Sequence, residues 1–144
     1  MKNVFYLCVF TLGLIGCDKN KQAVNNLEGE WSIDTYIFDS INYKIESAKM
    51  EFEVCDLTKE DCEGEYYLLA SYTEVNGSFE VLKQVDFIQK FDYAVTESGN
   101  EMFMTFVDEN GFVSSVEFDM ELKENKLDLT SVDGSFEIEL ERKD

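Results

Sequence analysis

Carboxylates are the groups of this chain with the greatest capacity for chemistry, because its 144 residues include 31 Asp or Glu and no His. Without His, the commonest general base and a preferred zinc ligand are missing, which excludes Ser-His-Asp and Cys-His catalysis and most transition-metal sites. The chain also has no glycine-rich phosphate loop, nucleophile elbow or metal-ligating helix motif. We therefore expect a protein that is not an enzyme, with no catalytic residues, no metal and no cofactor.

A row of carboxylates is predicted near the C-terminus. The turn signals at 124–125 and 133–134 are consistent with two-residue loops. If both loops have that length, counting back along the strands places Glu121, Asp128 and Glu139 side by side. Like charges directly opposed destabilise a sheet. The row is therefore either a solvated face or a binding site for a calcium ion or a basic partner.

A second candidate site is apolar. Aromatic and thioether side chains, which adapt well to apolar ligands, recur at alternate positions of the C-terminal half. The set is Met102, Met104, Phe106, Phe118 and Met120. A three-residue loop with a left-handed Gly111 would turn this set inward, whereas a two-residue loop would turn Phe103 and Thr105 inward. The same side chains could equally fill a core. Trp31, the only tryptophan, is likewise either a core plug or the border of a ligand cavity.

The elements that must position these groups are β-strands. Apolar and acidic residues alternate with a period of two, most clearly over 116–122 and 136–141. Residues 39–48 are less clear, because Ile41 and Ile45 lie four apart, and this stretch is either a loop or one short helix. Strands are expected at 30–38, 49–55, 65–73, 78–83 and 86–96, with a weak break around Gln84, and in four segments that turn signals delimit after residue 98.

One apolar and one acidic face on each strand is typical of an antiparallel sheet curled around a core, since helix-covered parallel strands are apolar throughout. An open sheet of about eight strands would leave exposed edges. We therefore predict an all-β fold, an antiparallel up-and-down meander of about eight strands that closes into a barrel. The alternative is a sandwich of two sheets.

The N-terminus has a basic residue, an apolar run and small residues, which are the marks of a secretory signal. The motif Leu14-Ile15-Gly16-Cys17 resembles the lipobox of bacterial lipoprotein signal peptides. The resemblance implies cleavage before Cys17, a lipid on this cysteine, and a location in the bacterial cell envelope. The outer membrane is the expected location, with the domain on the periplasmic face or the cell surface. The expected parts are a signal peptide over 1–16, the lipidated cysteine with a flexible tether over 17–26, and one domain over 27–144.

The charge of the processed chain argues against nucleic acid as a partner. Cleavage would leave 11 basic and 31 acidic residues, a net charge of −20. Binding to phosphates requires a basic stripe, and neither Lys nor Arg clusters in this chain. Outside the signal, no apolar run approaches the roughly 20 residues of a spanning helix. The expected partners are therefore the membrane through the lipid, a small apolar ligand, or a basic protein.

Two cysteines remain if Cys8 leaves with the signal peptide and Cys17 takes the lipid. Disulfides persist in exported proteins, so Cys55 and Cys62 are expected to pair. Their spacing suits the two ends of a hairpin loop, where opposed residues come within disulfide reach.

The entry of the first predicted strand carries a further resemblance. Its sequence, Leu27-Glu28-Gly29-Glu30-Trp31, is similar to the Gly-x-Trp start of lipocalin-like barrels. In that family the tryptophan plugs one end of the barrel and the strands run up and down. The cysteine loop, the hairpins and the strand at Phe136-Glu137-Ile138 are similar to those of small lipocalin-like lipoproteins of Gram-negative envelopes. The arginine that often covers the tryptophan in lipocalins has no evident match, because the only arginine, Arg142, lies at the far C-terminus.

Together these features predict a lipid-anchored, lipocalin-like, non-catalytic binding module of the cell envelope. In one hypothesis, Trp31 and the apolar set line a cavity that holds a small apolar or amphipathic ligand. In the alternative, the interior is filled by its own side chains, and the acidic outer face of an accessory subunit docks a basic envelope partner.

Overall fold

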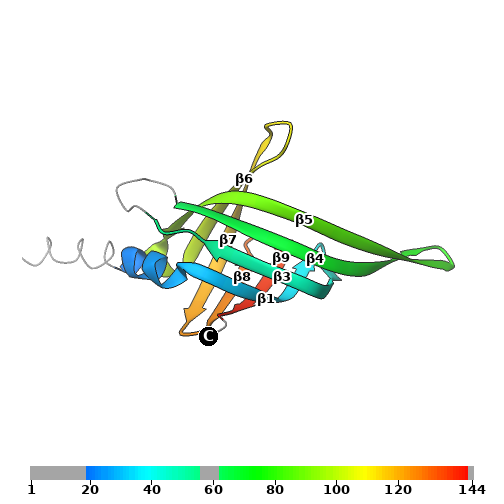
Figure 1. Cartoon of the computed structure of the whole chain (residues 1–144), viewed down its shortest axis with the longest axis horizontal. Helices are drawn as coiled ribbons and strands as arrows, with labels where there is room; N and C mark the ends of the chain where they lie inside the picture. The colour runs from blue at the N-terminus through cyan, green and yellow to red at the C-terminus, as the bar shows by residue number, and fades with distance from the viewer. Residues whose placement is uncertain (1–18, 56–61, 143–144) are drawn as a thin grey trace, which may run out of the picture.

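The computed structural model describes residues 19–55 and 62–142, and the fold is all-β apart from two short helical segments. Residues 19–27 form a helix ahead of the strands, and η1 is a short 3-10 turn (Figure 1). The strands are β1 (Gly29–Phe38), β2 (Ile41–Asn42), β3 (Lys44–Phe52), β4 (Cys62–Asn76), β5 (Phe79–Thr96), β6 (Glu101–Val107), β7 (Val113–Lys123), β8 (Lys126–Ser131) and β9 (Phe136–Glu141), with η1 at Glu97–Gly99.

The nine strands form one antiparallel sheet that closes into a ring. The strand order is β2-β1-β3-β4-β5-β6-β7-β8-β9, and an additional pairing between β1 and β9 joins the two ends. Neighbouring strands follow one another along the chain, apart from the two-residue β2. The prediction of an all-β, antiparallel, closed sheet is thus confirmed, and the hydrogen-bonded neighbours run through a single sheet rather than two.

Two strand predictions were wrong, for identifiable reasons. Residues 39–48 form neither a loop nor a helix throughout, because Asp39 and Ser40 adopt positive φ and turn the chain into β2 and β3. The predicted break around Gln84 does not exist, since Gln84 pairs with Ser71 and β5 continues without interruption. The polar side chain of this residue lies in a part of β5 that extends beyond the core, so it did not indicate a turn.

The core fills the ring with side chains that alternate along each strand. The turn between β6 and β7 has Gly111 at a φ of 81°, and Met102 lies opposite Phe118. Of the two loop lengths considered for this turn, two or three residues, the three-residue loop therefore forms. It turns the apolar set inward. In β1, a bulge between Ile33 and Thr35 shifts the alternation. Consequently Tyr36, and not Ile37 as the sequence pattern indicated, continues the buried face of Trp31.

The helix at residues 19–27 differs from the flexible tether predicted over 17–26. Its Val24 and Leu27 are buried in the same core cluster as Trp31, so the helix packs on one end of the ring. Gly99 of η1 lies against it, since a Cβ at this glycine would be 3.0 Å from the Cβ of Ala23. Within residues 19–55 and 62–142, no helix is long and apolar enough to cross a membrane. Cys17 and the predicted signal peptide lie outside the described residues.

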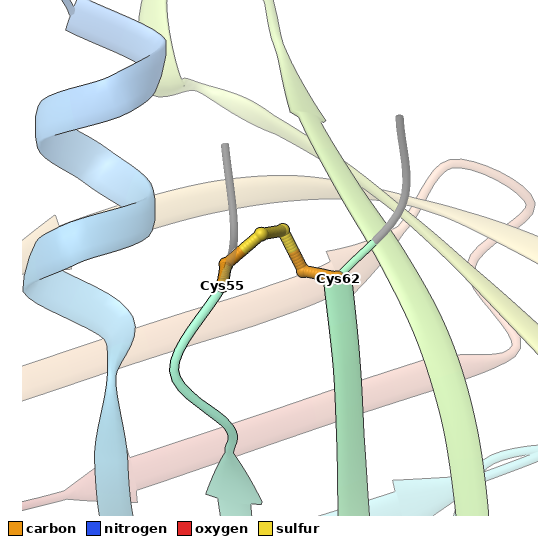
Figure 2. The surroundings of a disulfide bond; sticks show 2 residues. All are labelled: Cys55 and Cys62. Atoms are coloured by element: carbon orange, nitrogen blue, oxygen red, sulfur yellow. A yellow bond between two sulfur atoms is a disulfide. The ribbon is translucent and has the colours of Figure 1, made fainter. Parts of the chain in front are cut away.

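The predicted disulfide between Cys55 and Cys62 is confirmed. It joins the chain after β3 to the first residue of β4, as Figure 2 shows, and the two Cα atoms are 5.1 Å apart. The N–H of Glu53 donates to the carbonyl of Glu63 at 3.0 Å, which continues the strand pairing up to the crosslink. The two cysteines thus close a hairpin loop, as their spacing indicated.

Replacing both cysteines with serine is expected to lower the free energy of unfolding by about 2–3 kcal/mol, because the crosslink restricts the unfolded chain. Urea unfolding followed by circular dichroism measures the loss. The wild-type protein under a reducing agent serves as the control and should unfold at the same urea concentration as the double variant. An unchanged midpoint in the double variant would contradict the prediction.

Candidate functional site

The predicted carboxylate row is present on the outer face of the ring. Asp128 of β8 lies opposite Glu121 of β7 on one side and opposite Glu139 of β9 on the other. The acidic row, as we call Glu121, Asp128 and Glu139, therefore crosses three adjacent strands as predicted. Glu121 and Glu139 are exposed and Asp128 is half-buried, so all three side chains are on the outer surface.

The β8–β9 turn fixes the register that assembles this row. The Oδ1 of Asp133 accepts hydrogen bonds from the hydroxyls of Ser135 and Ser131, at 2.6 and 2.7 Å, and from the Ser135 N–H at 2.9 Å. These bonds, led by the Ser135 hydroxyl, lower the pKa of Asp133 to about 2. Because the carboxylate stays ionised above that pH, the turn keeps its acceptor, and Asp128 and Glu139 stay opposed, across the physiological range.

The negative charge of the acidic row is only partly compensated. Lys123 contacts Glu121 at 2.8 Å, and this hydrogen bond raises the pKa of the lysine. The Thr35 hydroxyl donates to the Oε2 of Glu139 at 2.7 Å. Among the residues that the structure describes, Asp128 forms no salt bridge. Glu139 likewise forms no salt bridge in the described part of the chain, and the charge of Asp128 also raises the pKa of Lys123.

A second carboxylate row, on β1, β3 and β4, provides a comparison. Glu51 of β3 lies between Glu30 of β1 and Glu65 of β4. In this reference row Lys49 contacts Glu30 at 2.8 Å, and Lys90 lies opposite Glu65 without forming a salt bridge with it. Each of the two rows therefore has one salt bridge, at one end.

A shallow hollow of about 360 Å³ lies beside the acidic row. It includes Asp119, Glu121 and Asp128, with the side chain of Thr130 at its edge. Within the described part of the chain, no group of three acidic or cysteine side chains is arranged to hold a metal ion. The hollow thus adds a third carboxylate, that of Asp119, beside two members of the acidic row.

The predicted apolar ligand residues pack against one another inside the ring. Trp31 and Met102 are 0% exposed, Met104 and Phe118 are 1% exposed, and Met120 is 5% exposed. All five belong to one continuous cluster of buried side chains. Phe106 is the exception, because it is only half-buried at the edge of this cluster. The structure thus brings the predicted set together as packed core.

Arg142 covers Trp31, contrary to the expectation that the tryptophan has no arginine partner. The guanidinium carbon lies 4.4 Å from the centre of the Trp31 ring, and the Trp31 Nε1–H donates to the Leu27 carbonyl at 2.7 Å. Arg142 also donates to the carbonyls of Asn26 and Glu28, at 2.7 and 2.9 Å. The C-terminal arginine therefore fastens the helix end, the first strand and the last strand together.

A groove of about 550 Å³ lies outside the ring, between the helix and the end of β7. Of the predicted ligand residues only Met120 borders it, next to Leu122. Its lining also includes charged side chains of both signs, which are Lys19, Lys123, Arg142, Glu121 and Glu124. Because its charges are mixed, this groove does not favour an apolar ligand.

Half-buried aromatic rings gather at the other end of the ring, and sequence reasoning missed most of them. Tyr36 and Tyr43 meet edge to face at 5.4 Å, and Tyr66 and Phe87 do the same at 5.4 Å. Phe106 lies 6.2 Å from Tyr66. Burial raises the pKa of both Tyr36 and Tyr66, so both hydroxyls remain protonated at neutral pH. These aromatic residues could have been found by asking which positions of β4 and β5 face inward.

Comparison of the chain with family models, with curated proteins and with solved structures gives no match.

Proposed function

We propose that this chain is a lipid-anchored, lipocalin-like protein of the bacterial cell envelope that acts as a non-catalytic interaction module. Its acidic row docks a basic partner, and its barrel is filled by its own side chains. The anchor is a lipid on Cys17, in the outer membrane. The observation that carries the proposal is the placement of Asp128, which forms no salt bridge of its own, between two opposed carboxylates on the outer face.

The energetic argument is that the acidic row costs stability. Directly opposed like charges on neighbouring strands disfavour the folded sheet. Salt screens such repulsion between exposed groups without removing it. A bound cationic group would convert this repulsion into attraction at three carboxylates at once, and complementary charge of this kind accelerates and orients association.

The lipocalin-like part of the proposal rests on two features that the resemblance implied. Eight long strands close into a ring in sequence order, and Trp31 plugs one end beneath Arg142. The filled interior agrees with the fact that small eight-stranded barrels are often only wide enough for their own side chains. In this proposal the acidic row, Glu121, Asp128 and Glu139, binds the partner, whereas an internal cavity binds the ligand in a ligand carrier.

The test removes the charge of the acidic row without changing its shape. The variant Glu121→Gln, Asp128→Asn, Glu139→Gln is expected to bind a decalysine peptide about tenfold more weakly or worse, a loss of about 1.4 kcal/mol. Its free energy of unfolding should rise by about 0.2–1 kcal/mol for each relieved pair. Isothermal titration and urea unfolding measure the two effects.

The matched control is the reference row, with Glu30→Gln, Glu51→Gln and Glu65→Gln on the three adjacent strands β1, β3 and β4. This variant loses the same formal charge as the acidic-row variant. If the acidic row is the docking face, the decalysine affinity of the control should fall less than about threefold, because the removed charges lie outside that face. Equal losses in the two variants would assign binding to the overall charge and refute a defined face.

A second candidate function is favoured by the aromatic end of the ring. Tyr43, Phe87 and Phe106 are half-buried there, and aromatic rings of this kind bind small apolar or amphipathic molecules. Native mass spectrometry of the protein purified gently from its envelope would reveal a reproducible small-molecule mass. Such a ligand should be retained as ionic strength rises, whereas a partner on the acidic row should dissociate.

A further inference from the structure

Strand β5 has a long edge without a neighbour. Its whole length pairs with β4 on one side, from Phe79 to Tyr93. On its other side it pairs with β6 only from Phe91 to Thr96. In the part of the chain that the structure describes, residues 79–90 of β5 therefore have no strand on that side. Figure 1 shows the β4–β5 hairpin extending beyond the rest of the sheet, away from β6.

Charged side chains are the only one of the usual protections against strand pairing that the sequence of this free edge carries. Natural sheets blunt their edges with proline, with bulges or with very short strands. The β4–β5 pairing here is unbroken and the chain contains no proline. Apolar side chains remain exposed along the edge, with Phe79 at 77%, Leu82 at 73% and Ile88 at 64%. An edge of this length and composition is suited to pairing with another strand.

We propose that the partner is a second copy of this chain, joined antiparallel along residues 80–90 of β5 about a two-fold axis at Val85. The two ring-shaped sheets would then share one continuous hydrogen-bonded ladder. In such an isologous interface a residue of one copy that meets a second residue in the other copy is itself repeated by symmetry, so that each contact occurs twice, and only the residue on the axis meets its own counterpart. The argument for the second copy is the charge pattern of the edge itself.

The register follows from the symmetry. Directly opposed residues of an antiparallel pair lie on the same face, and a two-fold pairing keeps the faces of the two copies alike. The axis must therefore pass through a residue. With Val85 at the axis, Glu80 of each copy faces Lys90 of the other, and Leu82 faces Ile88. Two ion pairs and two apolar pairs thus form on the outer face.

Neighbouring registers are worse. An axis at Asp86 places two aspartates against each other, and an axis at Lys83 does the same with two lysines. An axis at Gln84 brings no opposite charges together and places Leu82 against Asp86. Val85 is therefore the centre, among these four, that brings opposite charges together, through Glu80 and Lys90, and opposes no like charges.

A membrane is the competing occupant of the exposed apolar side chains, and the arrangement disfavours it. The tip of the β4–β5 hairpin lies at the end of the molecule opposite the helix of residues 19–27 (Figure 1). That helix begins two residues after Cys17, so a lipid there would hold the other end of the molecule at the membrane. The charges of Glu80, Lys83 and Asp86 also interrupt the apolar residues of the edge.

Site-specific crosslinking tests the register in the full-length protein in detergent. Val85→Cys places two thiols directly opposite each other across the axis, within reach of a disulfide. Mild oxidation should therefore convert most of this variant into a covalent dimer. The matched control is Val81→Cys, on the same strand and face and exposed in the monomer, which should stay uncrosslinked because its two copies lie far apart along the ladder. Equal crosslinking of both variants would overturn the register.

Charge exchange tests whether the partner is the chain itself. Glu80→Lys and Lys90→Glu should each weaken self-association about tenfold in sedimentation experiments, because each places like charges together twice. The double variant Glu80→Lys, Lys90→Glu should restore the wild-type dimer. A wild-type chain that stays monomeric, or a double variant that is not restored, would overturn the proposal. So would flotation with phospholipid vesicles that is lost in Leu82→Asp, which would identify the membrane as the occupant.

Discussion

Trp31→Ala is expected to lower the free energy of unfolding by about 3–5 kcal/mol, the loss typical of a large aromatic removed from a core. Trp31 is 0% exposed and plugs one end of the ring. Its removal also ends the hydrogen bond to the Leu27 carbonyl and leaves Arg142 without the ring beneath it. Urea unfolding followed by circular dichroism measures the loss, since the variant has no tryptophan fluorescence.

Two further variants separate the parts of this effect. Trp31→Phe keeps an aromatic ring but no donor for Leu27, so it should lose less than the alanine variant. Arg142→Lys keeps the charge but not the fork of donors that reaches both Asn26 and Glu28, and it should also be destabilised. A loss below about 1 kcal/mol in Trp31→Ala would contradict a plug that holds the helix on the ring.

The sequence predicted the C-terminal half of the fold well because the physical signals there are local. Strand β7 from Val116 to Leu122 and strand β9 alternate apolar and acidic residues, and short turns separate them from β8. Turn length fixes register, and register fixes which side chains are neighbours. The side-by-side placement of Glu121, Asp128 and Glu139 could therefore be obtained by counting.

Features that depend on distant contacts could not be obtained in this way. Arg142 is far from Trp31 in sequence, and only the closure of β9 on β1 brings it over the ring. The bulge in β1 places Tyr36, and not Ile37, on the buried face. It is a local irregularity without a sequence signal such as glycine. The continuation of β5 through Gln84 was hidden because both faces of the projecting hairpin are exposed, which removes the alternation that marks a strand.

Met104→Ala is the substitution that best separates a filled interior from a hollow one. The Met104 side chain is 1% exposed and lies in the ladder between Tyr93 and Val116. If it is packed core, its truncation leaves a cavity and should lower the free energy of unfolding by about 2–5 kcal/mol. Met104→Leu, which nearly conserves volume, should lose less than about 1.5 kcal/mol and serves as the control.

A binding cavity would behave differently, because the wall of a hollow site has few partner atoms to lose. In that case Met104→Ala would leave stability nearly unchanged while it weakened a bound apolar molecule. The packing of Met102 and Phe118 around the same position favours the first result. In the function that we propose, a filled interior assigns recognition to the outer surface, where Asp128 forms no salt bridge and residues 79–90 of β5 pair with β4 alone among the described residues.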